Sequence, residues 1–192
     1  TTVRQFGSLD ILINNAGVSG HALLEDVTAD KLAWYEDMMR VNLWGSVYCT
    51  HAALPALKAS HGRIVAVSSL AGLVGVPGRT AYCASKFAMA GFFEALRAEV
   101  KDAGVSVTIA YPGVVRTNIR HHGFNAQGEM AGVSGLHEEK AMSTQDCARQ
   151  IIYGMVRRRR EVVMTAPGKL ARYLKLVAPW LVEHIAQAAV KK

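Results

Sequence analysis

The sequence predicts a single α/β domain built around a parallel β-sheet. Short apolar runs of strand length alternate with longer stretches in which apolar residues recur at helical spacing, a pattern typical of strands joined by crossover helices. The strand-length runs are continuously apolar, as expected for strands buried on both faces. The chain has 192 residues and shows no internal repeat. This length supports one core without metals or disulfides.

Four apolar stretches are predicted as strands: residues 9–13, 63–67, 105–110 and 161–165. The first ends at Asn14, the second runs into Ser68 and Ser69, and the third is followed by Tyr111 and Pro112. Open parallel sheets bind ligands in the crevice at the carboxyl ends of their strands. The residues at these ends are therefore candidates for a binding site.

Helices are predicted between the strands. Residues 30–58 and 81–101 carry apolar side chains at helical intervals, and Gly104 follows the second stretch where a C-terminal cap is expected. Thr144 is expected to cap another helix that extends to about Arg158.

Residues 113–143 break every periodic pattern, with scattered glycines and two adjacent histidines. Long connections of this kind are usually lids or binding loops, so we expect a mobile substrate loop here, with a poorly ordered spacer as the alternative. Phe124, Met130 and Leu136 within it indicate an apolar ligand, although such side chains also anchor loops to a core.

The C-terminal residues 168–192 are predicted as a basic amphipathic extension that Pro179 breaks into two short helices. Residues 149–192 hold 10 Lys/Arg against 2 Asp/Glu, whereas residues 1–148 hold 12 against 13. The extension is expected to pack on its own domain, to lie on an anionic membrane surface, or to cover a neighbouring subunit. Nucleic-acid binding is not expected, because the charge is not interleaved with aromatic stacking groups.

The cysteine count and the hydropathy pattern limit the compartment. The three cysteines, at positions 49, 83 and 147, cannot all pair and lack the C-x-x-C spacing of zinc sites. No stretch approaches the roughly 20 apolar residues that span a bilayer, and the first residues do not resemble a signal peptide. We therefore expect a cytoplasmic protein, with membrane association confined to residues 168–192.

Tyr82 and Lys86 lie four residues apart at the start of a predicted helix, on one face. A nearby ammonium favours the phenolate of a tyrosine, so this pair predicts an acid/base group for a hydroxyl or carbonyl oxygen. Ser69, at the end of the preceding strand, is placed to donate a hydrogen bond to the same oxygen.

Five segments resemble, in order and spacing, the short-chain dehydrogenase/reductase family. They are Asn14-Asn15-Ala16-Gly17, Val41-Asn42, Ser69, Tyr82-Cys83-Ala84-Ser85-Lys86 and Pro112-Gly113-Val114-Val115-Arg116-Thr117. The resemblance covers about residues 9–119, with a compatible helix and strand to residue 165. It implies the Rossmann-like, doubly wound parallel sheet of that family.

The resemblance also implies roles for the matching residues. The catalytic tetrad would be Asn42, Ser69, Tyr82 and Lys86, with Asn42 holding a water in a proton relay and Lys86 also binding the nicotinamide ribose. The cofactor-binding residues would be Asn14, Ala16, Gly17, Tyr82, Lys86, Pro112, Gly113, Val115 and Thr117. The implied reaction interconverts a secondary alcohol and a ketone with NAD or NADP, in a homodimer or homotetramer.

One feature of the family is absent. The glycine-rich turn T-G-x-x-x-G-x-G, which receives the cofactor pyrophosphate, does not occur in this sequence. We therefore expect the chain to hold the C-terminal part of the fold, with about three strands missing ahead of Thr1. Residues 1–167 would form the catalytic portion and residues 168–192 the extension. As given, the chain is expected to bind NAD(P) weakly, and the residues that distinguish NAD from NADP are absent.

Three other functions match parts of the sequence. A non-enzymatic binding or scaffold protein that kept the fold without a working cofactor site is the main alternative. A serine hydrolase is disfavoured because no G-x-S-x-G elbow surrounds a serine. A metal hydrolase is disfavoured because the His121-His122 pair lacks ligand spacing.

Overall fold

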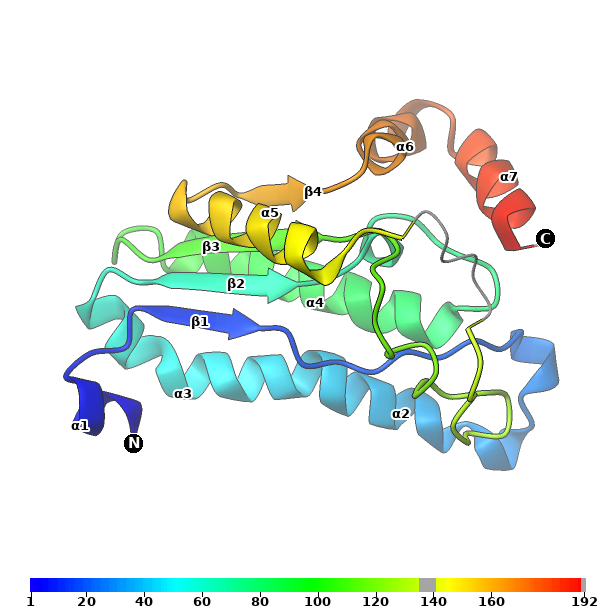
Figure 1. Cartoon of the computed structure of the whole chain (residues 1–192), viewed down its shortest axis with the longest axis horizontal. Coiled ribbons are helices and arrows are strands. Elements are labelled where there is room, and N and C mark those ends of the chain that lie inside the picture. Colours follow the sequence, from blue (N-terminus) through cyan, green and yellow to red (C-terminus); the bar gives the residue numbers. More distant parts are fainter. Residues whose placement is uncertain (135–140, 191–192) are drawn as a thin grey trace.

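A computed structural model describes residues 1–134 and 141–190 and contains a four-stranded parallel sheet in the order β1-β2-β3-β4 (Figure 1). The strands are β1 (Ile11–Asn14), β2 (Arg63–Val67), β3 (Ser106–Tyr111) and β4 (Glu161–Val163). All four predicted strands are thus confirmed: β2 matches its predicted bounds, and the other three differ by one or two residues at their ends.

Helices cover both faces of the sheet, as predicted for a doubly wound fold (Figure 1). One face carries α2 (Ala33–Met39), α3 (Gly45–Ala59) and α4 (Thr80–Glu99); the other carries α5 (Thr144–Val156). Side chains alternate between the two layers along β2: Ile64 and Ala66 join the core with α3 and α4, whereas Val65 packs with Cys147 and Ile151 of α5.

The predicted helix over residues 30–58 is a succession of turns of different helix types. A short 3-10 turn, η2 (Ala29–Lys31), precedes α2, and a π-helical turn, η3 (Arg40–Trp44), joins α2 to α3. Such π-turns are frequent at functional sites. This one contains Asn42, whose side chain is fully buried.

The remaining elements correct one helix end and one helix start. Gly104 has a φ of +71° but does not cap α4 as predicted: the helix ends at Glu99 with Val100 as its cap residue, and Gly104 lies in the turn that leads to β3. The cap of α5 is Ser143 rather than Thr144, because the Ser143 hydroxyl accepts the hydrogen bond from the Asp146 N–H; this helix ends at Val156, before Arg158.

The C-terminal segment forms two helices, α6 (Ala166–Val177) and α7 (Pro179–Val190), so the predicted break at Pro179 is confirmed. The other short elements are α1 (Thr2–Phe6), η1 (Leu24–Asp26) and η4 (Leu70–Gly72). Within the described residues, no helix combines the length and apolar character needed to cross a bilayer.

Candidate active site

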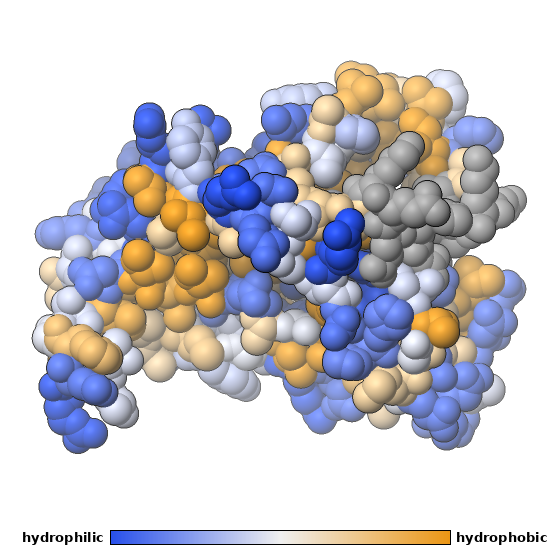
Figure 2. All heavy atoms as spheres, in the orientation of Figure 1, coloured by the Kyte–Doolittle hydropathy of each residue, from blue (hydrophilic) through white to orange (hydrophobic). Residues whose placement is uncertain are grey.

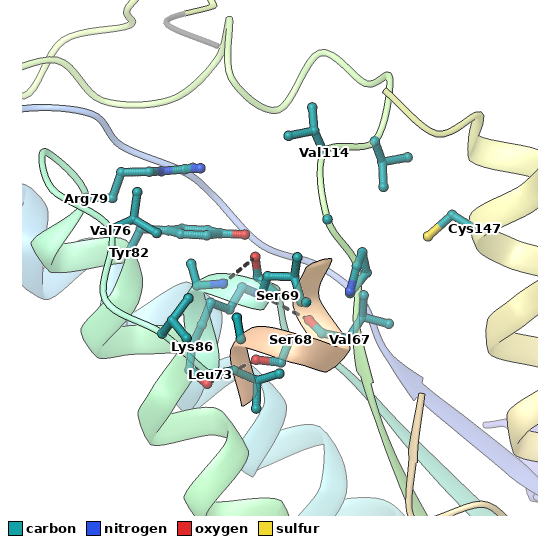
Figure 3. A pocket seen from close by; sticks show the side chains of 18 of the residues that line it. Val67, Ser68, Ser69, Leu73, Val76, Arg79, Tyr82, Lys86, Val114 and Cys147 are labelled. Atoms are coloured by element: carbon teal, nitrogen blue, oxygen red, sulfur yellow. Dashed lines mark hydrogen bonds between the residues drawn. The ribbon is translucent and has the colours of Figure 1, made fainter. Parts of the chain in front are cut away.

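A cavity of about 750 Å³ lies at the carboxyl ends of the strands, where the sequence predicted a site. It is bounded by the segments that follow β1, β2 and β3, by the first turns of α4 and α5, and by α6 and α7. Figure 3 shows that Ser69 and Tyr82 face Val114 and Cys147 across this space. Ser69, Tyr82 and Lys86 all line it, so the structure brings these three predicted residues together.

Tyr82 stands in the first turn of α4 with only 8% of its surface exposed. Its phenol hydrogen-bonds with the side chain of Ser69, which raises the share of phenolate, but burial acts in the opposite direction and dominates. The pKa of Tyr82 is therefore raised above its ordinary value of 10 in the chain alone. The Tyr82–Lys86 spacing predicts the opposite direction, a pKa of Tyr82 lowered by the ammonium of Lys86.

Lys86 lies beside the Tyr82 ring, but its ammonium is engaged at the end of β2, and its predicted effect on the phenol stays a prediction. Its Nζ donates a 3.0 Å hydrogen bond to the Val67 carbonyl and lies 5.8 Å from the centre of the Tyr82 ring. Burial of the ammonium lowers the pKa of Lys86 to about 8. The lysine is thus held at the end of β2, facing the cavity, in a position suited to donate hydrogen bonds to a bound ligand.

Arg79, which the sequence analysis did not single out, lies against Tyr82. Its guanidinium carbon is 4.4 Å from the centre of the tyrosine ring, and its charge is the largest influence that lowers the pKa of Tyr82. Figure 3 shows the arginine side chain alongside the ring. The available signal was its position three residues before Tyr82, about one helical turn away.

Asn42 lies beside this cluster but uses its amide to hold the backbone. Its Oδ1 accepts from the Val18 N–H at 2.8 Å, and its Nδ2 donates to the Val18 carbonyl at 3.0 Å and to Ser85 Oγ at 2.9 Å. These bonds hold the segment after β1 against η3 and α4. The predicted role in a proton relay stays a prediction.

The residues predicted after β1 divide into two groups. Gly17 lines the cavity, and a Cβ there would lie 2.9 Å from Asn42 Oδ1 and 3.5 Å from Lys86 Nζ, so only glycine leaves this space open. Asn14 is buried and donates to Thr50 Oγ1 at 3.0 Å, and Ala16 is exposed outside the cavity. Asn15, which was not predicted, lines it instead.

The four residues predicted after β3 all line the cavity: Pro112, Gly113, Val115 and Thr117. A Cβ at Gly113 would lie 2.9 Å from Thr165 Cγ2. The chain therefore passes close to the segment that leads into α6, and this wall is built largely from backbone.

The apolar residues predicted to contact substrate lie elsewhere. Phe124 stacks on Trp34 with ring centres 5.7 Å apart and belongs to a separate core, and Met130 is 67% exposed. Leu136 lies outside the described residues. Among the described residues of the 113–143 segment, it is positions 114, 115 and 119 that supply apolar lining, and most of the rest comes from η4, α5, α6 and α7.

Burial of Lys86 predicts a pH-dependent stability. In the unfolded chain the lysine titrates near 10.5, whereas in the folded protein its pKa is about 8, so between these values the unfolded state binds more protons and stability rises with pH. Relative to Lys86→Met, we expect the free energy of unfolding to increase by about 2–3 kcal/mol from pH 7 to 10. Urea titrations of both proteins measure this, and a difference independent of pH would contradict it.

The described residues contain no cluster of three or more metal-ligating side chains. A family model described as short chain dehydrogenase matches residues 1–128. The chain belongs to the short-chain dehydrogenase family.

Two relatives of the chain carry dehydrogenase names. Dehydrogenase/reductase SDR family member 7B of Bos taurus is 35% identical over 189 residues, which cover 97% of this chain and 57% of the relative. The 11-beta-hydroxysteroid dehydrogenase-like 2 of Arabidopsis thaliana is 36% identical over 184 residues, which cover 96% of this chain and 57% of the relative. The chain thus spans a little more than half the length of these dehydrogenases.

A solved structure confirms the Rossmann-like fold. A short-chain dehydrogenase from Burkholderia cenocepacia, in complex with NADP, superposes with a TM-score of 0.78 at 23% identity, covering 96% of this chain and 71% of that one. Helices on both faces of a parallel sheet are therefore shared with the family.

Proposed function

We propose that this short-chain dehydrogenase interconverts a secondary alcohol and a ketone with NAD or NADP. The observation that carries the proposal is the convergence of Ser69, Tyr82 and Lys86 on one cavity at the carboxyl ends of the strands. A hydroxyl, a phenol and an ammonium so placed can bind one oxygen and exchange a proton with it.

The residues present fit the nicotinamide half of such a cofactor. A Cβ placed at Gly17 would lie 3.5 Å from Lys86 Nζ, so the glycine leaves an open space beside the ammonium. This space has room for a ribose whose hydroxyls would accept hydrogen bonds from the ammonium. The backbone wall from Pro112 to Thr117 would face the nicotinamide ring. The glycine-rich turn for the pyrophosphate does not occur in this sequence, so the chain supplies donors for one half of the cofactor.

The protein's part in the reaction is placement and proton transfer. The cofactor supplies or accepts hydride. In ketone reduction Ser69 and Tyr82 donate hydrogen bonds to the carbonyl oxygen, and Tyr82 gives up its proton as the alkoxide forms. Lys86 would hold the cofactor ribose beside them. In alcohol oxidation Tyr82 acts as the base and must first lose its proton.

We infer that the substrate is apolar. Away from Ser69, Tyr82 and Lys86, the walls are mostly aliphatic, with contributions from Leu73, Val114, Ile151 and Leu174. An apolar wall favours a hydrocarbon skeleton and penalises an unpaired polar group.

The test is oxidation of NADH or NADPH with a series of apolar ketones, measured by absorbance for the naturally expressed protein and its Tyr82→Phe variant. Turnover that Tyr82→Phe abolishes supports an enzyme. If the protein neither turns over ketones nor binds either nucleotide, the scaffold alternative holds.

We propose that the exposed apolar ridge of α6 and α7 contacts a membrane surface. The ridge consists of Leu170, Tyr173, Leu176, Val177, Trp180 and Ile185, all more than half exposed. Figure 2 shows apolar side chains gathered at this end of the molecule. Leu170 and Ile185 also line the cavity, so the ridge adjoins its wall. Large exposed apolar patches mark interaction surfaces, and a bilayer matches both this patch and an apolar substrate.

Two basic residues of this segment are engaged within the protein, which leaves less charge for an anionic membrane surface than the sequence indicated. Arg172 pairs with Glu161, and Lys175 donates to the Leu73 carbonyl at 2.9 Å. Binding should therefore depend chiefly on the ridge. In vesicle sedimentation we expect replacement of both Leu176 and Val177 by Gln to weaken binding about tenfold or more, because two apolar side chains are lost. Phe6→Gln, a change at an exposed site on α1, should not; equal sedimentation of all three proteins would contradict the proposal.

The homodimer or homotetramer implied by the resemblance is also a proposal. Trp44 and Tyr48 stack on the exposed side of η3 and α3, with ring centres 5.8 Å apart, and offer an apolar contact for a second copy. Light scattering of the purified protein measures its assembly.

A further inference from the structure

The guanidinium of Arg79 lies closer to the centre of the Tyr82 ring than the ammonium of Lys86 does. Its central carbon lies 4.4 Å from the ring centre, a cation–π distance, compared with 5.8 Å for Lys86 Nζ. Arg79 is also held from its far side, because its Nη2 donates to Ser19 Oγ at 2.5 Å. The arginine is thus fixed between the segment after β1 and the phenol.

Arg79 and Lys86 both lie near the Tyr82 ring, but their cationic groups have different hydrogen-bond partners. Lys86 directs its ammonium to the Val67 carbonyl, toward the end of β2. Arg79 lines the cavity, and its Nε is buried without a hydrogen-bond partner among the described residues. Leaving a buried donor unpaired is costly, so the guanidinium is held here by its stacking and by Ser19 rather than by a full set of hydrogen bonds.

The charges around Tyr82 come from three parts of the fold. The facing titratable groups are Arg79 directly before α4, Cys83 and Lys86 on α4, and Arg120 on the 113–134 segment, with Ser69 as the neutral partner after β2. Behind Arg79 lies His21, whose pKa is lowered by burial and by the arginine, so it is neutral at pH 7. Among these groups Arg79 is the cation in closest contact with the phenol ring.

We propose that Arg79 is a positioning residue for the reaction: it fixes the Tyr82 ring and stabilises its phenolate. This inference rests on the proposed function for its catalytic meaning, but the coupling between Arg79 and the phenol exists without cofactor or substrate. Burial alone would hold Tyr82 protonated, and the guanidinium offsets part of that effect.

Removing the charge of Arg79 should raise the pKa of Tyr82 further, because one interaction that favours the phenolate is lost. Alcohol oxidation needs the phenolate, so its rise with pH should shift to higher pH in Arg79→Gln. Ketone reduction needs the protonated phenol, so its loss at alkaline pH should also shift upward. A purely structural role for Arg79 would lower turnover without moving either midpoint.

The direct test is a titration of the phenol itself. The protein is produced with fluorotyrosine, whose phenol ionises at lower pH than tyrosine, and its 19F resonances are followed with pH; Tyr82→Phe assigns the signal of residue 82. We expect Arg79→Gln to raise the midpoint of that signal by about one pH unit or more. Arg79→Lys, which keeps the charge, should restore most of the shift. An unchanged midpoint in Arg79→Gln overturns the proposal.

The matched control is Arg63→Gln at the start of β2, away from the cavity. Arg63 is likewise half-buried, with an Nε that lacks a partner in the described part of the chain. It should leave the midpoint of residue 82 unchanged, and an equal shift there would overturn the assignment to Arg79. If Arg79→Gln does not fold, Arg79→Met replaces it under the same criterion, with Arg79→Lys again as the variant that keeps the charge. The fluorine signal needs no turnover, so the two proposals can fail separately. A shifted midpoint in a protein without activity supports the role of Arg79 and contradicts the proposed reaction.

Discussion

Tyr82→Phe should lower turnover about 10²–10⁴-fold, the usual contribution of a positioned proton donor. The substitution removes one oxygen from a buried ring, so the packing with Ala71 and Ala81 is retained. What is lost is the proton that the phenol would transfer to substrate and its hydrogen bond with Ser69. The measurement is the steady-state oxidation of NADH or NADPH with an apolar ketone in the naturally expressed protein.

Tyr35→Phe provides the control for this prediction. Tyr35 also carries a phenol beside the start of α4, where its hydroxyl hydrogen-bonds with Thr80 Oγ1 at 2.7 Å, but it does not line the cavity. Its removal should change turnover no more than a few-fold. If Tyr82→Phe kept a rate close to that of Tyr35→Phe, Tyr82 would not be the proton donor. Nucleotide binding, followed by nicotinamide fluorescence, should be largely retained in both variants.

The sequence predicted which residues meet, because the carboxyl ends of parallel strands converge and residues four apart share a helix face. These two rules, together with the resemblance to the short-chain dehydrogenase family, single out Ser69, Tyr82 and Lys86. The rules do not say where a long side chain turns. Lys86 reaches the Val67 carbonyl, and this contact exists only once β2 and α4 are packed. The same packing places Arg79 over the phenol, which no local spacing could distinguish from a solvated charge.

The apolar residues of the 113–143 segment illustrate a different limit. Phe124 was as compatible with a core as with a substrate wall, and its partner Trp34 lies 90 positions away in the sequence, so nothing local identified the choice. The walls that do surround the cavity are supplied by α5, α6 and α7. Their helical periodicity was visible, but which face turns toward the cavity depends on how the helices dock.

Asn42→Ala should lower the free energy of unfolding by about 2–5 kcal/mol, because it removes the side chain that bonds both backbone groups of the partly buried Val18. The Val18 N–H and carbonyl bond to the Asn42 amide at 2.8 and 3.0 Å, and alanine satisfies neither. Ser85 Oγ also loses the bond that it accepts from Asn42. Urea denaturation followed by far-ultraviolet circular dichroism measures the change.

Asn15→Ala is the matched control, since Asn15 is exposed and should cost less than about 0.5 kcal/mol. A similar small cost for Asn42→Ala would show that its bonds to Val18 do not hold the segment after β1. A large cost has a consequence for the site as well. Gly17, next to Val18, leaves open the space beside Lys86, so loosening this segment should weaken nicotinamide binding even though Asn42 does not line the cavity.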